Sequence, residues 1–309
     1  MRVSVVVPCY RSVRTLGSLV ARLTDVLPAA TSCYEVILVV DGSPDETWDV
    51  ARDLALRHGP VRAIRLARNY GQHNALIAGL RAARYDVVVM MDDDLQHPPE
   101  EIPKLLAALT DDLDLVYAVP HEEEHGVARS FASRLVKRGL SLAGGVQNAK
   151  LLSSFLVFRT FLRGGFDQVA GPHVSLDVCL SWTTTRVGSV AVHMAHRSEG
   201  RSGYTFTTLV RYALNMILGY STRPLRLATY LGFLVGAAGL ALLVRVLWAY
   251  DASVPGYTSI ASMIAIFSSA QMIFIGLLGE YIGRIHSGGM GRPTYVIRES
   301  AGTADADPR

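Results

Sequence analysis

The sequence predicts an α/β domain built on a doubly wound, mostly parallel sheet, followed by helices that span a membrane. Two observations predict this fold class. Short β-rich runs alternate with helical stretches over residues 1–118, and strongly apolar runs are concentrated toward the C-terminal end. The composition suits both parts, because 50% of the residues are hydrophobic and only 18% are charged. We therefore expect an N-terminal domain, residues 1–204, and a separate membrane region.

The N-terminal domain shows a repeat of strands and helices. The runs that predict strands are VSVVV, YEVILVV, VRAIRL, DVVVMM and LDLVYA. Between the first two, apolar residues recur at helical spacing from Leu16 to Leu27. The segment Ser43–Glu46 fits a capping box with proline at the first helical position, so we expect a helix straight after the second strand. Pro98 and Pro99 open a later helix. In such a sheet, ligands bind beyond the carboxyl ends of the strands.

Two apolar runs near the C-terminal end, 227–250 and 259–282, are each long enough as helices to cross a hydrocarbon core of about 30 Å. A pair of buried helices in a large soluble core is the alternative. Residues 205–226 carry an apolar stripe at helical spacing, which predicts an amphipathic helix in the membrane interface, with a core-packed helix as the alternative. Arginines before the first run and after the second place both termini in the cytoplasm. Residues 285–309 are then a cytoplasmic tail with a disordered end.

Charge and motifs exclude several classes of function. The net charge of +3 is small, and no dense basic run is interleaved with aromatic residues, which argues against nucleic acid as a partner. The sequence contains no GxGxxG and no Walker loop, which argues against a dinucleotide enzyme and against a P-loop NTPase.

Three consecutive carboxylates, Asp92–Asp94, follow the buried run DVVVMM. If the backbone is still extended there, Asp92 and Asp94 point to one side and Asp93 to the other. Two neighbouring carboxylates repel unless a cation compensates them. Mg²⁺ or Mn²⁺ suits such a pair, because these ions take oxygen ligands and often share a site with substrate phosphates; Gln96 offers a further oxygen. The alternative is a solvated acidic turn that caps the helix at Pro98.

Several segments together resemble a known family. These are VSVVVPCY, VDGSPDET, RNYGQHNALIAGL, MDDDLQHPPEEIP, HRSEGRSGYTF, STRPLR, GLLGEYIGRI and RPTYVI. They are similar to the polyprenyl-phosphate glycosyltransferases of family 2, in particular the undecaprenyl-phosphate glucosyl and 4-deoxy-4-formamido-arabinose transferases. The resemblance covers nearly the whole chain. It implies a Rossmann-like GT-A domain followed by two transmembrane helices, in an enzyme of the cell membrane whose catalytic domain is cytoplasmic.

The resemblance also implies an activity. Such an enzyme transfers a single sugar, with inversion, from a nucleotide-diphosphate sugar to a polyprenyl phosphate such as undecaprenyl phosphate. A UDP-sugar is the favoured donor, and Mg²⁺ or Mn²⁺ assists the reaction. The resemblance further implies a homo-oligomer such as a tetramer.

Residue by residue, the resemblance assigns the donor side of the site. The positions that match nucleotide-sugar ligands are Pro8, Tyr10, Asp41, Asp92 and Asp93. The positions that match metal ligands are Asp92, Asp94 and Gln96, and Asp94 is therefore a candidate catalytic residue. Taken singly, Tyr10 could be an ordinary loop residue and Asp41 a helix N-terminal acid. Within the full set of motifs, we expect both at the nucleotide.

The acceptor side is assigned in the same way. The positions that match phosphate ligands are Arg129, Ser133, Arg134, Arg197 and Ser202, with Arg197 also a candidate catalytic residue. For the helix expected over 127–142, a solvated basic face is the alternative. A phosphate acceptor is already an anion and needs no general base. The spare carboxylate of Asp177 is expected on a helix surface.

The chain departs from the family pattern on the sugar and acceptor side. Arg11 and Ser12 follow the first tyrosine, Pro120 stands where an arginine is usual, the run LLSSFLVFR lacks the usual Asp, and Gly203 replaces a lysine. The donor sugar can therefore differ from the familiar ones. Two alternative functions follow. One is a catalytically silent protein that binds nucleotide sugars; the other is a processive polysaccharide synthase, although the QxxRW motif of that class is missing.

Overall fold

The computed structural model describes residues 1–121, 153–166, 175–194, 223–248 and 256–302. Contacts between Cα atoms divide the chain into two compact units. The first comprises Met1–Lys137, Val146–Gly203 and Gly291–Arg309, and the second comprises Arg138–Gly145 and Tyr204–Met290.

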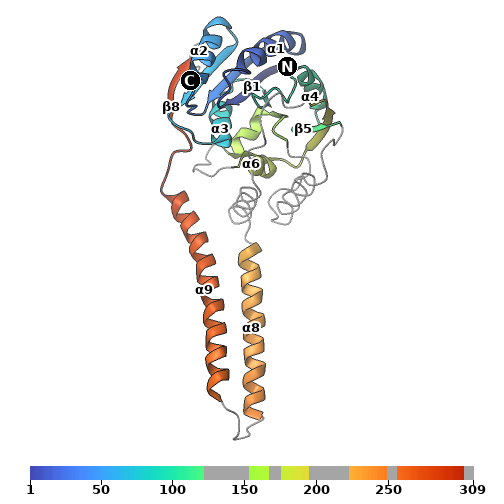
Figure 1. Ribbon diagram of the computed structural model, residues 1–309. Coiled ribbons are helices and arrows are strands. Elements are labelled where there is room, and N and C mark those ends of the chain that lie inside the picture. Colours follow the sequence, from blue (N-terminus) through green and yellow to red (C-terminus); the bar gives the residue numbers. More distant parts are fainter. Residues whose placement is uncertain (122–152, 167–174, 195–222, 249–255, 303–309) are drawn as a thin grey trace. The chain divides into compact units, whose positions relative to one another are not determined.

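The first unit contains an eight-stranded sheet in the order β7-β5-β6-β4-β1-β2-β3-β8 (Figure 1). Its strands are β1 (Arg2–Cys9), β2 (Cys33–Val40), β3 (Val61–Leu66), β4 (Val87–Met90), β5 (Leu115–Pro120), β6 (Leu156–Arg159), β7 (Val187–Val192) and β8 (Ile297–Ala301). The pairs of β1 with β2 and β4, of β2 with β3 and of β5 with β7 are parallel, whereas β6 and β8 run antiparallel to their neighbours. All five strands predicted from β-rich runs are confirmed, and the sheet is mostly parallel as predicted.

Helices cover both faces of this sheet (Figure 1). One buried cluster joins α1 (Leu16–Ala30), α2 (Thr47–Arg57) and α4 (Ile102–Ala108) to one face, and a second joins α3 (Gln72–Ala82) and α6 (Leu176–Thr183) to the other. A 3-10 turn, η1 (Pro99–Glu101), precedes α4, and another, η2 (Thr160–Gly165), follows β6. The doubly wound arrangement is therefore confirmed.

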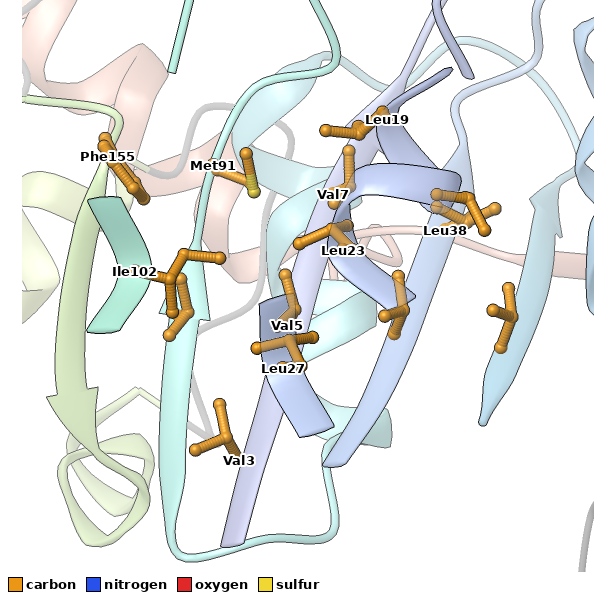
Figure 2. Packing of buried hydrophobic residues seen from close by; sticks show 14 of the residues in the cluster. Val3, Val5, Val7, Leu19, Leu23, Leu27, Leu38, Met91, Ile102 and Phe155 are labelled. Atoms are coloured by element: carbon orange, nitrogen blue, oxygen red, sulfur yellow. The ribbon is translucent and has the colours of Figure 1, made fainter. Parts of the chain in front are cut away.

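The packing of α1 on β1 shows how the apolar pattern builds the core. Leu19, Leu23 and Leu27 lie against the side chains that β1 and β2 direct to the same face (Figure 2). Each of the three leucines is fully buried. Burial of one leucine side chain stabilises a fold by about 1.5–3 kcal/mol. The helical spacing of these leucines is therefore what fixes α1 on the sheet.

The start of α2 differs from the prediction. We expected a capping box at Ser43 with Pro44 at the first helical position, but α2 begins at Thr47. The Ser43 hydroxyl instead accepts a hydrogen bond from the backbone N–H of Arg11 at 2.9 Å and donates to Asp45 at 2.5 Å. Asp45 accepts from the backbone N–H of Thr47 at 3.3 Å. Ser43 thus joins the loop after β2 to the loop after β1. Asp45, and not Ser43, accepts a hydrogen bond from the first residue of α2.

The strand β8 comes from the segment predicted as a cytoplasmic tail. It pairs with β3, where Ala63 faces Ala301 and Arg65 faces Glu299, and these two charged side chains form an ion pair of 3.1 Å. Ahead of β8, the carbonyl of Val296 accepts a hydrogen bond from the N–H of Ala67 at 2.8 Å. Residues beyond the second predicted span thus form the edge of the sheet. The predicted disordered end, 303–309, lies outside the described residues.

The second unit contains two long helices, α8 (Arg223–Trp248) and α9 (Gly256–Gly289). Within the described residues, α8 is the helix that is long and apolar enough to span a membrane, over Pro224–Ala241. The second predicted span, 259–282, lies inside α9. The two helices touch where the ring of Phe267 lies 3.2 Å from the position a Cβ would take at Gly239. Of the amphipathic helix predicted over 205–226, residues 205–222 lie outside the described residues.

Candidate functional site

The carboxyl ends of the parallel strands β1, β2 and β4 lie at one edge of the sheet. The register places Cys9 opposite Val40 and Val6 opposite Met90, so the loops that follow these strands emerge together. These loops carry Tyr10, Asp41 and the acidic triplet. The predicted donor-side residues are therefore brought to the edge where ligands of such sheets bind.

Asp41 fastens the loop after β2 to the loop after β3. Its two carboxylate oxygens accept hydrogen bonds from the backbone N–H groups of Tyr70, at 2.7 Å, and Gly71, at 2.8 Å. Burial raises the pKa of Asp41, and these two N–H groups together with the charge of Arg68 oppose that rise. Gly42 lets the loops approach closely, since a Cβ there would lie 2.2 Å from the carbonyl carbon of Arg68. Asp41 therefore holds these two loops together, and we call the surface that they form, from Asp41 to Gly42 and from Arg68 to Gly71, the floor of the site.

Tyr10 stands beside this floor with its ring available to a ligand. The side chain is 44% exposed, and the guanidinium carbon of Arg11 lies 5.6 Å from the centre of the ring. Pro8 is placed differently, because it is buried within β1 opposite Val39. An exposed aromatic ring next to a polar floor suits stacking of a nucleotide base, whereas Pro8 supports the strand from which Tyr10 emerges.

The acidic triplet is less extended than expected. β4 ends at Met90 and the chain bends from Asp93 onward, so the argument from strand alternation is wrong in its premise. The Asp93 carboxylate nevertheless binds different partners from the carboxylates of Asp92 and Asp94. It accepts hydrogen bonds from the Ser12 hydroxyl and from the backbone N–H of Tyr10. Burial, with a smaller contribution from Asp92 and Asp94, raises the pKa of Asp93 to about 6.

Asp92 has a different set of hydrogen-bond partners from Asp93. Its Oδ1 accepts from the amide of Gln72 at 2.7 Å, and its Oδ2 accepts from the hydroxyl of Ser154 at 2.6 Å. Its backbone N–H points to Nδ1 of His97 at 3.4 Å. His97 is buried against the ring of Phe155, and that burial lowers the pKa of the imidazole. Two side-chain donors therefore fix the orientation of the Asp92 carboxylate, and the buried His97 ring contacts the backbone of the same residue.

The residues predicted as metal ligands suit a hard cation. Asp94 accepts from the backbone N–H of Gln96 at 3.1 Å, so Asp92, Asp94 and Gln96 belong to one half-buried turn. In the described part of the chain, no group of three or more His, Cys, Asp or Glu side chains is arranged to hold a metal. Mg²⁺ commonly binds through one or two carboxylates and completes its coordination with substrate phosphates and water. The oxygen donors fit that kind of site.

His73 and Asp177 extend the site beyond Asp92. The backbone N–H of Leu176 donates to Nδ1 of His73 at 3.4 Å, which joins the start of α6 to the first turn of α3. The expectation that Asp177 lies on a helix surface is wrong. The residue is half-buried; burial raises the pKa of its carboxyl, the neighbouring His73 opposes that rise and the charge of Asp92 adds to it.

The structure thus brings Tyr10, Asp41 and the acidic turn together, with Gln96 beside them. The predicted acceptor-side residues lie outside the described residues: Arg129, Ser133, Arg134, Arg197 and Ser202. Sequence reasoning did not assign Ser12, Gln72, His73, Ser154 or Asp177 to the site. The quoted motif RNYGQHNALIAGL contains two of them, whereas nothing local in the sequence indicates that Asp177 lies near Asp92.

Comparison with known sequences identifies the family of this chain. Residues 4–165 match the family described as Glycosyl transferase family 2, and residues 223–285 match the GtrB C-terminal hairpin. An undecaprenyl-phosphate 4-deoxy-4-formamido-L-arabinose transferase from Enterobacter sp. (strain 638) is 32% identical over 96% of this chain and 93% of its own length. A relative of the same name from Pseudomonas fluorescens (strain SBW25) is 31% identical over 99% of this chain and 92% of its own length.

Solved structures share the fold. A mannosyltransferase from Pyrobaculum calidifontis, in complex with GDP-Man and Mn²⁺, covers 93% of this chain and 86% of its own, with a TM-score of 0.52 and 17% identity. A Mycobacterium tuberculosis glucosyl-3-phosphoglycerate synthase, in complex with Mn²⁺, UDP and glucosyl-3-phosphoglycerate, covers 70% and 78%, with a TM-score of 0.53 and 20% identity. The likeness confirms a GT-A-like domain. Because the family match spans more than half of the chain and the relatives span nearly all of it, the chain is a glycosyltransferase and belongs to glycosyl transferase family 2.

Proposed function

We propose that this enzyme transfers a single sugar from a UDP-sugar to undecaprenyl phosphate, with inversion, at the cytoplasmic face of the cell membrane. The observation that carries the proposal is the likeness to relatives named undecaprenyl-phosphate transferases along nearly their whole length, at about one residue in three. The match to the GtrB C-terminal hairpin and the apolar helix α8 support anchoring in a membrane, where a polyprenyl phosphate resides.

The donor side of the proposal is supported by the described residues. The ring of Tyr10 stacks on the base, and the floor fastened by Asp41 receives the ribose. Asp92, Asp94 and Gln96 would hold Mg²⁺ or Mn²⁺, which neutralises charge on the departing diphosphate. Gln72 and Ser154 keep the Asp92 carboxylate aimed at that position. The Asp93 carboxylate, turned toward Ser12, fixes the loop that carries Tyr10.

The acceptor side remains a proposal from sequence. The guanidinium groups of Arg129, Arg134 and Arg197, with the hydroxyls of Ser133 and Ser202, bind the acceptor phosphate. A phosphate oxygen is already anionic, so it attacks the anomeric carbon directly and no residue has to remove a proton. A single displacement of this kind inverts the configuration at that carbon. The positions of these side chains lie outside the described residues.

We further propose a homo-oligomer in the membrane. Gly232 and Gly236 of α8 have the GxxxG spacing that lets two helices approach closely. Within the described residues, a Cβ at either glycine would meet nothing within 4 Å, so that face of α8 is open to a second copy of the chain. The second span, in α9, and the cytoplasmic location of both termini complete the proposed topology.

The test is transfer by the full chain in lipid nanodiscs, supplied with Mg²⁺, undecaprenyl phosphate and a panel of UDP-, GDP- and dTDP-sugars. We expect one sugar per lipid from a UDP-sugar. Asp94→Ala should lower the rate by about 100-fold or more, because a metal contributes several kcal/mol to such a transition state. Asp25→Ala, at an exposed position of α1, is the matched control. An unchanged rate in Asp94→Ala would refute the metal assignment.

The same assay separates the alternatives. Product from no donor, with nucleotide sugar still bound, would favour a catalytically silent binding protein. A polymer instead of a single-sugar lipid would favour a processive synthase. The intact acidic turn, with both oxygens of Asp92 fixed by hydrogen bonds, supports the catalytic assignment over the silent one.

A further inference from the structure

We propose that Asp177 and His73 form a subsite that binds a hydroxyl group of the donor sugar and thereby selects which sugar is transferred. This inference rests on the proposed function, because it requires a nucleotide-sugar donor. The two residues lie on different helices, α6 and α3, and neither belongs to the positions that match nucleotide, metal or acceptor ligands.

The first support is the connection of these helices to the acidic turn. Leu176, the neighbour of Asp177, donates its N–H to His73 Nδ1, and Gln72, the neighbour of His73, donates its side-chain amide to Asp92. Two consecutive residues of α3 therefore bind the start of α6 and the acidic turn. The subsite is built from the same contacts that hold Asp92.

The second support is the order of the groups along a nucleotide sugar. The base and ribose lie at Tyr10 and Asp41, and the diphosphate lies at the acidic turn, so the sugar lies beyond that turn. The two oxygens of Asp92 accept hydrogen bonds from Gln72 and Ser154. His73 follows Gln72 along α3, and its ring is bonded to the start of α6, so His73 and α6 lie next to the contacts that hold Asp92. A sugar ring bound beyond the diphosphate would therefore meet His73 and Asp177.

The third support is the hydrogen-bonding capacity of the pair. Among the described residues, no hydrogen bond joins the half-buried Asp177 carboxylate to a protein donor. Nδ1 of His73 accepts from Leu176, so the ring proton lies on Nε2, which likewise donates to no partner in the described part of the chain. The pair therefore offers one acceptor and one donor. A hydroxyl group both donates and accepts, and it matches the two at once.

Other ligands fit less well. A phosphate group would be repelled by the Asp177 carboxylate, which already lies near Asp92. A metal ion held by His73, Asp92 and Asp177 is not supported, because the described side chains form no such cluster. Buried polar groups are normally satisfied by hydrogen bonds, and an uncharged sugar hydroxyl satisfies this pair without adding charge.

The test uses Asp177→Asn in the full chain in nanodiscs, with binding of UDP and of UDP-sugars measured by calorimetry. The probes are UDP-glucose, UDP-galactose, UDP-xylose and UDP-N-acetylglucosamine, and the one bound most tightly by the parent protein is followed. A hydrogen bond to a charged group predicts that the variant binds this UDP-sugar about 10-fold more weakly or worse. Its affinity for UDP should stay within about twofold of the parent value.

Two variants of His73 separate its two nitrogens. His73→Gln can place a side-chain amide donor near the position of Nε2, and we expect it to keep most of the UDP-sugar affinity. His73→Asn can accept from Leu176 as Nδ1 does but lacks the Nε2 donor, and we expect it to lose about 10-fold. Asp25→Asn is the matched control for a lost carboxylate, and an unchanged melting temperature shows that each variant is folded.

The outcomes distinguish this inference from the proposed function. If the parent protein binds and transfers a UDP-sugar but Asp177→Asn weakens UDP and UDP-sugar equally, or neither of them, the subsite is refuted and the proposed function stands. If the parent protein binds no UDP-sugar and transfers none, the proposed donor is wrong and the subsite fails with it. A loss confined to the sugar-bearing ligand supports both.

Discussion

Ser154 donates a hydrogen bond to the carboxylate of Asp92 across 2.6 Å, from the segment just before β6 to the acidic turn after β4. The bond fixes the oxygen that Gln72 leaves free. We predict that Ser154→Ala lowers kcat/KM by about 10-fold, because loss of one hydrogen bond to a charged group costs about 1.5 kcal/mol. The Mg²⁺ concentration that gives half of the maximal rate should rise in the same variant, because a carboxylate that is held less firmly binds its cation less tightly.

The measurement for Ser154→Ala is a titration of transfer rate against Mg²⁺ concentration. Ser18→Ala, at an exposed position of α1, serves as the matched control. A variant whose Mg²⁺ dependence matches that of the parent protein would show that Asp92 is held well enough by Gln72 alone.

Gly42 is predicted to be intolerant of any side chain. Its φ of +55° is a conformation that side chains disfavour, and a Cβ there would lie 2.2 Å from the backbone of Arg68. Gly42→Ala should therefore push apart the loops that Asp41 joins and lower the free energy of unfolding by about 3 kcal/mol. Binding of UDP should weaken with it, because the floor of the site moves.

Thermal unfolding and UDP binding check this prediction together. Gly59→Ala is the control, because a Cβ at Gly59 meets nothing within 4 Å among the described residues. Equal melting temperatures for the two alanine variants would contradict the close approach of the loops.

Asp93 is predicted to make stability depend on pH. Its pKa of about 6 in the folded protein lies above the value of about 4 for an unfolded chain, so the folded state holds the proton between these values. The resulting stability is present at low pH and is lost as the pH rises from about 4 to about 6. Asp93→Asn should abolish this loss and be more stable than the parent protein at pH 7, by on the order of 2 kcal/mol.

Denaturant unfolding from pH 4 to pH 7 in buffer with a chelator measures this slope without a bound cation. Asp49→Asn, on the surface of α2, should retain the slope of the parent protein. The assignment to Asp93 would be contradicted by an Asp93→Asn variant that keeps it.

The fold was predictable where local sequence decides structure. Runs rich in β-branched residues gave β1 to β5, and leucines at helical spacing gave α1. The start of α2 was mispredicted because the Ser43 hydroxyl accepts a hydrogen bond from Arg11 in another loop. A local sequence pattern cannot reveal such a contact. The strand β8, IRESA, is short and polar, and it forms because the edge of β3 accepts it.

The site divides in the same way. Asp92–Asp94 were found because three carboxylates stand together after a buried strand. Asp177 was misplaced because a single carboxylate on a predicted helix is most often solvated, and its neighbours His73 and Asp92 are distant in sequence. Ser154 lies in the run LLSSFLVFR, which stood out in the sequence only because it lacks the usual Asp. Its contact with Asp92 depends on β6 pairing antiparallel with β4, which the sequence does not specify.

The strand β8 is predicted to protect the edge of the sheet. It covers β3 with backbone hydrogen bonds and with the ion pair between Arg65 and Glu299. An uncovered strand edge pairs readily with other chains. Deletion of residues 297–309 should therefore lower the melting temperature of the GT-A-like domain by about 5 °C or more and cause aggregation that grows with protein concentration. Deletion of 303–309 alone, which leaves β8 in place, should change neither property. Differential scanning fluorimetry and light scattering of the full chain and both truncations provide the measurement. Equal melting temperatures for the two truncations would mean that β3 is stable without its partner and that β8 contributes little to the fold.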